Sequence, residues 1–325
     1  MTRSPIALSC GEPAGVGPEL AEKAWSALRN DLSFFWIGDP AHLPGNVPAI
    51  EISAPAEATT KMQIGMPVLP MRFAGNATPG MADPRNATGV MQAIALGTKL
   101  CIQGEASALC TAPIHKKALK DGADFPFPGH TEYLAHLSGV DRVVMMLASD
   151  QLRVVPATIH IALSDVPKAL TPALLRETIE ITAMGLKTQF GVTAPRIAIA
   201  GVNPHAGEGG AMGREELDWI ARLIEDMRAE GHDLLGPLPA DTMFHAAARA
   251  RYDAAIAMYH DQALIPIKTL DFDRGVNVTL GLPFIRTSPD HGTAFDISGK
   301  GLANPSSLIE ALKMADRMAA ARVDF

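Results

Sequence analysis

The sequence predicts an α/β protein built on a largely parallel sheet. Short apolar runs alternate with amphipathic segments along most of the chain, 47% of the residues are hydrophobic, and only 19% are charged. Strands that alternate with helices usually pair in parallel, and such strands are buried on both faces and therefore apolar throughout. The length of 325 residues corresponds to about two domains at ~150 residues each.

The first predicted elements are a strand and a helix. Residues 6–10 form a short apolar run, and apolar side chains recur at helical spacing from Leu20 to Leu28. Pro18 suits the first turn of a helix, where a missing N–H is tolerated. Glu19 suits the positive end of the helix dipole. A buried strand that leads directly into a helix is typical of α/β folds.

Similar patterns predict the remaining elements. Further strands are expected at residues 34–37, 108–111, 143–148, 154–159, 196–200 and 254–258, and helices at 174–190, 214–230 and 306–321. Segment 40–90 contains eight prolines. Because proline cannot donate to a strand ladder, this segment is expected to form loops or short edge strands.

Composition excludes several classes of protein. The net charge is −7 and no block of Lys or Arg occurs, so the chain lacks the positive surface that duplex nucleic acid requires. The longest apolar runs are far shorter than the ~18 residues that span a bilayer. Three cysteines without a CxxC motif and a short apolar stretch at the start argue against secretion. We therefore expect a cytoplasmic protein with no membrane or nucleic-acid partner.

A glycine-rich segment, residues 11–19, joins the first strand to the first helix. Gly15 and Gly17 match two glycines of the dinucleotide-binding fingerprint, and Asp39 lies 22 residues beyond Gly17, near the place of a ribose-binding acid. Leu20 stands where the third glycine is needed, which disfavours a Rossmann site. A tight turn, or N–H groups that line an active-site rim, are the alternatives.

Polar residues gather where strands are expected to end. Residues 111–116 (Thr-Ala-Pro-Ile-His-Lys) and 129–132 (Gly-His-Thr-Glu) are rich in hydrogen-bond donors. Open α/β sheets bind ligands at the carboxyl ends of their strands, and these donors suit a phosphate or a carboxylate. Solvated turns are the alternative interpretation.

Three of the ten histidines, His160, His205 and His260, follow or close apolar strands. Each alone is more often a hydrogen-bonded core histidine than a metal ligand. Together they are compatible with a three-histidine metal site that leaves positions open for substrate. Their spacing leaves both interpretations open, since no HExxH motif occurs.

The stretch 265–305 is dense in Gly, Thr, Asp and His and precedes the last predicted helix. A polar, glycine-rich loop of this length is usually functional. A long surface connection is the alternative.

Seven motifs together resemble the 4-hydroxythreonine-4-phosphate dehydrogenase (PdxA) family of bacterial pyridoxal phosphate biosynthesis, from about residue 6 to about residue 312. They are GEPAGVGPE (11–19), TAPIHK (111–116), PGHTE (128–132), NPHAGEGG (203–210), PADT (239–242), YHDQ (259–262) and RTSPDHGTAFD (286–296). The last motif also resembles a loop of isopropylmalate and isocitrate dehydrogenases.

The resemblance implies an isocitrate/isopropylmalate dehydrogenase-like fold of two α/β/α domains, not a Rossmann fold, with the active site in the interdomain cleft. The expected domains are residues 1–127 with 270–325 on the cofactor side, and residues 128–269 for metal, substrate and dimerisation. A homodimer with a shared active site is also implied.

The resemblance further implies the roles of individual residues. The metal ligands are His160, His205 and His260, the third from the other subunit. The substrate contacts are His130, Thr131, Lys268, Asn277 and Arg286, and the cofactor loop contains His291, Gly292, Thr293, Asp296 and Gly299. The catalytic candidates, among which the general base is not identified, are Asp241, Asp261 and Lys268.

The implied reaction is NAD- or NADP-dependent oxidation of 4-phosphooxy-L-threonine with decarboxylation to 3-amino-2-oxopropyl phosphate, on the route to pyridoxine 5′-phosphate. It requires a divalent metal, with Zn, Mg and Co as candidates. Related 4-phosphorylated sugar acids, threonate or erythronate phosphate, are alternative substrates. One departure is visible, because Glu12 stands where the family usually has Asp.

Two other classes of function remain. One is a transferase or hydrolase that uses the three-histidine metal without a nicotinamide cofactor, and the other is a metabolite-binding module without catalysis. Neither needs a dinucleotide site, so the loop at residues 291–301 favours the dehydrogenase.

Overall fold

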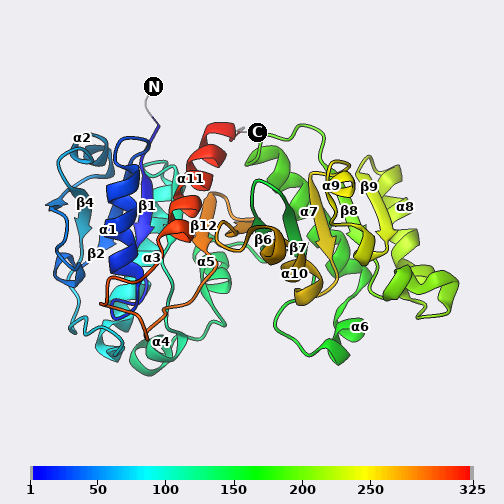
Figure 1. The fold of residues 1–325 in the computed structure, drawn as a ribbon, viewed down its shortest axis with the longest axis horizontal. Coiled ribbons are helices and arrows are strands. Elements are labelled where there is room, and N and C mark those ends of the chain that lie inside the picture. Colours follow the sequence, from blue (N-terminus) through cyan, green and yellow to red (C-terminus); the bar gives the residue numbers. More distant parts are fainter. Residues whose placement is uncertain (1–2, 323–325) are drawn as a thin grey trace. The chain divides into compact units, whose positions relative to one another are not determined.

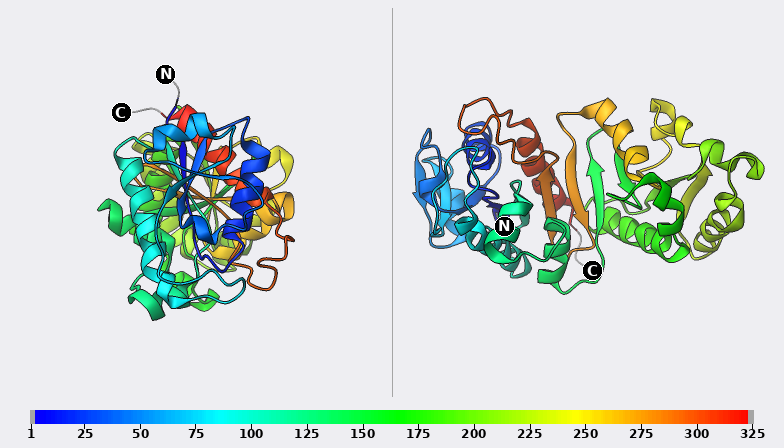
Figure 2. Two further views of the ribbon diagram at one scale, coloured as in Figure 1. Left: turned by 90° about the vertical axis from the view of Figure 1, so that its left-hand side faces the viewer. Right: turned by 90° about the horizontal axis from the view of Figure 1, so that it is seen from below.

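The computed structural model describes residues 3–322 and confirms the predicted α/β fold class (Figure 1). The described residues form two units. The first combines residues 3–143 with 276–320, and the second combines 144–275 with 321–322. In each unit helices lie on both faces of the sheet (Figure 2).

The first unit contains seven strands in the order β3-β4-β2-β1-β5-β12-β11. They are β1 (Ile6–Ser9), β2 (Phe34–Gly38), β3 (Ala49–Glu51), β4 (Met66–Pro70), β5 (Ala108–Thr111), β11 (Val276–Leu280) and β12 (Ile285–Pro289). All neighbours pair in parallel except β11 and β12. This order differs from the 3-2-1-4-5-6 order of a dinucleotide-binding Rossmann domain, as predicted.

Helices sandwich this sheet. They are α1 (Gly17–Leu28), α2 (Ala58–Lys61), α3 (Ala87–Ile102), α4 (Lys116–Ala123), α5 (His130–Ser138) and α11 (Ser306–Ala321). Helices α1 and α11 cover one face and α3 covers the other (Figure 2). Strand β2 is fully buried between them and supplies Phe34, Phe35 and Trp36 to the core.

The second unit contains five strands in the order β6-β7-β10-β8-β9. They are β6 (Val144–Ala148), β7 (Arg153–Pro156), β8 (Arg196–Ala200), β9 (Asp233–Leu238) and β10 (Ala254–Ala257). The helices are α6 (Val166–Ala169), α7 (Pro172–Thr188), α8 (Ala221–Ala229), α9 (Ala246–Arg249) and α10 (His260–Asp271). Only β6 and β7 pair antiparallel.

The expected strands and helices form, with three corrections. The strand expected at 154–159 ends at Pro156. The helix expected at 214–230 begins with a π-helical turn, Glu216–Ile220. The stretch 265–305 is not one long loop, because the end of α10 and the strands β11 and β12 lie within it. Short strands such as Val276–Leu280 carry polar residues at alternate positions. Such strands are therefore hard to recognise within a polar stretch of sequence.

The unit boundaries fall after residues 143 and 275, whereas the sequence suggested 127 and 269. Helix α5 contacts α3, which assigns residues 130–138 to the first unit. Gly275 lies against the side chain of Leu147 and so belongs with the second unit.

Parallel pairing brings distant segments to common edges. Strands β1, β5 and β12 run in one direction, so the segments 10–16, 112–115 and 290–305 all follow the same edge of the first sheet. In the second unit, the segments after β7, β10 and β8 share an edge in the same way. These two edges collect most of the motifs found in the sequence.

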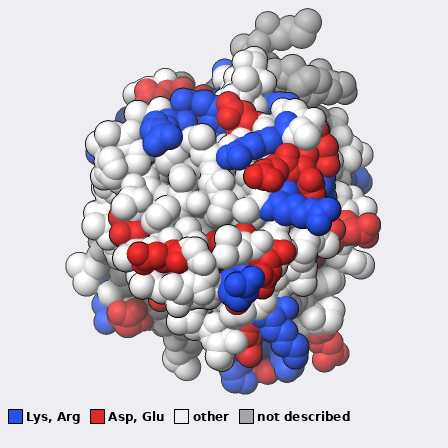
Figure 3. Space-filling view, turned by 90° about the vertical axis from the view of Figure 1, so that its right-hand side faces the viewer, with Lys and Arg blue, Asp and Glu red and all other residues white. Residues whose placement is uncertain are grey.

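Three features of the composition can be located in the structure. On the face that includes α8 and β9, acidic and basic side chains are interspersed, with no broad area of one sign (Figure 3). Within residues 3–322, no helix combines the length and the apolar character needed to cross a bilayer. All three cysteines are buried, and none of them forms a disulfide within residues 3–322.

Gly11 marks the closest backbone approach at the edge of the first sheet. Its φ is +66°, and a β-carbon there would collide with the carbonyl oxygen of Pro113. We expect Gly11→Ala to lower the free energy of unfolding by about 2–4 kcal/mol, from left-handed strain plus the collision. Gly45 is the matched control, since its φ is +80° and no atom lies within 4 Å of the place that a β-carbon would take. Gly45→Ala should cost only about 1 kcal/mol; equal losses in urea unfolding would contradict the steric argument.

Candidate functional site

Arg286 on β12 is a buried cation without a counter-ion. Its side chain is 3% exposed, and its two terminal nitrogens donate to the hydroxyls of Thr279 (3.0 Å) and Thr111 (2.7 Å). Its Nε is buried without a partner, and no ion pair joins it to a carboxylate in the described part of the chain. Burial lowers the pKa of Arg286 to about 10.

The energetic cost of burying the Arg286 guanidinium without a counter-ion indicates a binding site for an anion. An uncompensated charge in a protein interior is strongly unfavourable unless a partner of opposite charge is supplied. The hydroxyls of Thr111 and Thr279 orient the guanidinium but leave its charge in place. Sequence reasoning did not single out these two threonines, although polar residues within otherwise apolar buried strands were a usable signal.

The beginning of α5 lies beside Arg286. Its first residue, His130, has a buried Nε2 without a partner. The pKa of His130 is held well below its ordinary value by burial first, and then by the positive charges of Arg286 and Lys116. Gly129 offers no side-chain cap, so the first N–H groups of this nine-residue helix are available to an anion.

Four of the five predicted substrate contacts belong to this part of the first unit. Thr131 follows His130 on α5, and Asn277 lies on β11 two residues before Thr279 with its Oδ1 buried and unpartnered. The fifth, Lys268, belongs to α10 of the second unit, where its ammonium lies 5.7 Å from the ring centre of Phe272.

The predicted cofactor residues lie on the segment after β12. His291, Gly292, Asp296 and Gly299 are exposed, and Thr293 is half-buried. This segment is attached to the first glycine-rich turn. Val16 N donates to Thr293 O at 3.0 Å, and Ser298 Oγ donates to Ala14 O at 2.8 Å.

A half-buried ion pair on α1 holds the end of the same segment. Glu19 accepts from Ala303 N at 3.1 Å and pairs with Lys23 at 2.7 Å. Lys23 Nζ in turn donates to the carbonyls of Gly301 (2.9 Å) and Ala303 (2.7 Å). These contacts tie the loop at 291–301 to α1.

Glu12, at the position where the family resemblance implies Asp, supports the same turn. Its side chain is buried and accepts from Ala14 N at 3.1 Å. Burial raises its pKa, while the hydrogen bond from Ala14 acts in the opposite direction. The longer side chain thus closes a local turn beside the loop.

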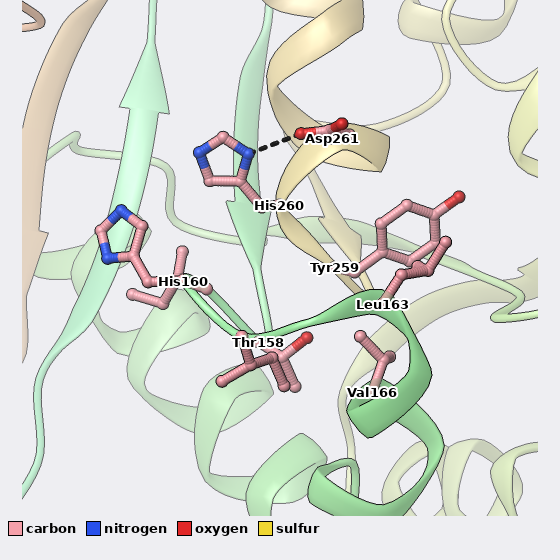
Figure 4. Close-up of a pocket in the computed structure, with 9 residues that line it drawn as sticks. Thr158, His160, Leu163, Val166, Tyr259, His260 and Asp261 are labelled. Carbon is pink, nitrogen blue, oxygen red and sulfur yellow. Dashed lines mark hydrogen bonds and ion pairs between the residues drawn. The ribbon is translucent and has the colours of Figure 1, made fainter.

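In the second unit, pairing of β7 with β10 brings two of the predicted metal ligands together. The ring centres of His160 and His260 are 5.8 Å apart (Figure 4). His260 Nδ1 donates to Asp261 Oδ1 at 2.7 Å, which leaves Nε2 directed away from this carboxylate. Both rings line a cavity of about 290 Å³ with Tyr259 and Leu163.

The donor chemistry fits a divalent metal. Two imidazoles that bind one tetrahedral zinc ion at ~2.1 Å have ring centres roughly 5 Å apart, close to the observed separation. A carboxylate on the second nitrogen is the usual partner of a metal-binding histidine, and Asp261 occupies that place on His260.

His205 does not join this pair. Among residues 3–322, no group of three His, Cys, Asp or Glu side chains is close enough to hold a metal ion. His205 Nδ1 instead donates to Glu208 Oε2 at 2.9 Å. This hydrogen bond raises the pKa of His205, and the charges of Glu208 and Asp241 add to the effect.

The backbone around His205 is left-handed. His205, Ala206 and Glu208 have φ values of 51°, 52° and 41°, within the segment Pro204–Gly210. Each non-glycine residue in this region costs roughly 1–2 kcal/mol. An exposed His–Glu pair is screened by solvent and contributes little to stability, so the pair cannot stabilise the turn by itself.

Buried polar groups hold the turn in place. Glu216, 3% exposed, accepts from Asn203 N at 2.9 Å and from Asn203 Nδ2 at 2.9 Å. Asn203 Nδ2 also donates to Glu215 at 2.7 Å. Gly207 and Gly213 let the chain pass close to Glu216 and Asn203. The π-helical turn, a feature often found at functional sites, supplies Glu216.

The catalytic candidates all belong to the second unit. Asp241 and Asp261 line a second cavity of about 430 Å³, with Phe244 and Ile265 among its apolar residues. Because Asp261 is hydrogen-bonded to His260, it is engaged in orienting that ring. Lys268 lies eight residues beyond His260 on α10.

Known proteins resemble this chain over its whole length. Residues 30–315 match the family described as pyridoxal phosphate biosynthetic protein PdxA. The chain is 70% identical to the 4-hydroxythreonine-4-phosphate dehydrogenase of Ruegeria sp. (strain TM1040), covering 99% of each. The 4-hydroxythreonine-4-phosphate dehydrogenase structure from Klebsiella pneumoniae has a TM-score of 0.89 at 36% identity, covering 97% of this chain and 99% of that one.

The lowered pKa of His130 predicts acid sensitivity. The unfolded chain takes up this proton below about pH 6.5, whereas the folded state resists it, so stability falls as the pH drops through that value. When the pH falls from 7.5 to 5.5, the free energy of unfolding should decrease by roughly 1 kcal/mol less in His130→Gln than in the wild type. His136→Gln, at an exposed position of the same helix, is the control. Parallel pH profiles for wild type and His130→Gln in urea denaturation would refute this.

Proposed function

The chain belongs to the PdxA family and is an oxidoreductase, and on this premise we propose that it oxidises 4-phosphooxy-L-threonine with NAD or NADP and a divalent metal. The oxidised product loses CO2 to give 3-amino-2-oxopropyl phosphate. The relatives named 4-hydroxythreonine-4-phosphate dehydrogenase support this substrate.

A single observation carries the assignment of a phosphorylated substrate. Arg286 is buried with only neutral hydroxyl partners, while its Nε and the Nε2 of His130 have none. A phosphate would supply the absent negative charge and accept from both side chains. The N–H groups at the start of α5, including that of Thr131, would serve the same anion. The side chain of Asn277 on β11 would belong to the same group of contacts.

The second unit would hold the metal and the reacting carbon. His160 and His260 present imidazole nitrogens at one cavity, and neutral imidazoles leave the full charge of a bound cation available. A divalent ion there would favour loss of the proton from the substrate hydroxyl and hold the electrons released when CO2 departs. Asp261 would keep the ring of His260 oriented.

The general base remains to be chosen between two groups. With Asp261 occupied by His260, Asp241 and Lys268 are the side chains we retain for proton removal. Geometry comes before pKa in such a choice, and a variant at each position decides it. Loss of kcat in one variant with an unchanged metal affinity would identify the base.

We assign the cofactor to the first unit. The exposed residues of the loop at 291–301 are held against the glycine-rich turn, which suits the long dinucleotide. The second unit would then carry the metal and the dimer contacts.

A homodimer would complete the metal site. Within one chain, His160 and His260 form a pair and no third ligand joins them in the described residues. This favours a different assignment from the one implied by the family resemblance: the pair is contributed by one subunit and the third ligand, His205, by the other. The segment that carries His205 ends in exposed positions, as a shared site requires.

The substrate proposal is tested by nicotinamide absorbance at saturating NAD or NADP. We expect turnover of 4-phosphooxy-L-threonine that a chelator abolishes and divalent metal restores. Arg286→Met should lower kcat/KM by at least about 100-fold, because it leaves the phosphate unpaired. Threonate and erythronate 4-phosphate, assayed in parallel, test the alternative substrates. Turnover that survives chelation would overturn the role of the metal.

The subunit assignment is tested with purified heterodimers that carry two different tags. A heterodimer of His160→Ala and His205→Ala should keep one intact site and roughly half of the wild-type activity. A heterodimer of His160→Ala and His260→Ala should be inactive. The reverse result would show that His260 is the ligand donated across the dimer.

A further inference from the structure

An exposed histidine and an exposed glutamate are held together by an unusual backbone. His205 and Glu208 are 59% and 57% exposed, and Nδ1 and Oε2 are 2.9 Å apart. Their φ values of 51° and 41° place both in the left-handed region that non-glycine residues avoid. Strain of this kind persists only where surrounding structure enforces it, and it concentrates at functional sites.

We propose that Glu208 is a positioning residue that fixes the imidazole of His205 with Nε2 directed outward for a divalent cation, and that the left-handed turn serves to bring the two side chains together. This inference rests on the proposed metal-dependent function. It assigns a role to Glu208, which is not itself a ligand.

The hydrogen bond determines which nitrogen is free. A carboxylate can only accept, so Nδ1 carries the proton of this hydrogen bond, and Nε2, on the opposite side of the ring, is the nitrogen that points away from Glu208. His260 shows the same arrangement with Asp261 at 2.7 Å. Two of the three predicted ligands thus carry a carboxylate on Nδ1, which is how proteins orient metal-binding imidazoles.

The scaffold of the turn does not depend on Glu208. The hydrogen bonds that hold it run from Asn203 to the buried Glu216 and to Glu215. Glu208 contributes only its contact to His205 among the side-chain hydrogen bonds described for it. Replacing Glu208 should therefore release the ring of His205 and leave the backbone in place.

The alternative interpretation is an incidental surface ion pair. Such a pair would shift thermal stability slightly and would not affect a metal. A direct measurement of metal affinity separates the two interpretations, because it needs neither substrate nor nicotinamide.

The experiment measures the dissociation constant of Zn²⁺ by chelator competition on the full-length protein at fixed pH. Glu208→Ala should weaken binding by about 10–100-fold. Glu208→Gln, which keeps an acceptor for Nδ1–H, should weaken it by less, roughly 3–10-fold. Asp218→Asn is the matched control, because it removes an exposed carboxylate paired only with Arg214 and should leave the constant unchanged.

A double-mutant cycle with His205→Ala completes the test. Once His205 is absent, Glu208→Ala should cause no further loss, because Glu208 acts through that ring. Zn²⁺ affinity of Glu208→Ala within twofold of wild type, when His205→Ala has lost it, would overturn the positioning role and leave the proposed function standing. Unchanged affinity in His205→Ala would overturn both. Thermal unfolding of each variant verifies that the turn remains folded.

Discussion

The uncompensated charge of Arg286 is the constraint around which the first unit is organised. The guanidinium lies between two strands whose threonines orient it without neutralising it. The start of α5 and the buried Nε2 of His130 lie beside it, so positive potential and unpaired donors accumulate at one place. In a chain of net charge −7, this local field decides what binds, because a buried cation acts at low dielectric and total charge does not.

In the second unit the candidate site consists of histidines and not of a buried cation. Two of its histidines are hydrogen-bonded to neighbouring carboxylates, His260 to Asp261 and His205 to Glu208. Parallel pairing of β7 with β10 brings His160 and His260 together although they are 100 residues apart in sequence. The first unit thus presents a buried cation with an unpartnered Nε, and the second presents imidazoles oriented by carboxylates.

The sequence predicted the apolar strands well, because burial on both faces leaves an unbroken apolar run. It missed β11, since the polar residues Asn277 and Thr279 interrupt the apolar run. The family resemblance identified His160, His205 and His260 as candidate ligands. Only the order of the strands shows which two of them lie close together. The left-handed turn at His205 could not be predicted from local sequence patterns. Its stability comes from Glu216, which is buried and lies 11 residues later. Thr111 was quoted within a motif, yet its contact with Arg286 spans 175 residues.

The attachment of the loop at 291–301 to α1 has a thermodynamic consequence. Lys23 and Glu19 hold three backbone groups at the end of this loop, one of Gly301 and two of Ala303, through short hydrogen bonds. A ligand that meets a loop already tied in place costs less chain entropy on binding than one that must fold the loop around itself. Binding and release of any ligand at this edge would then not require a segment of the backbone to order or to unfold.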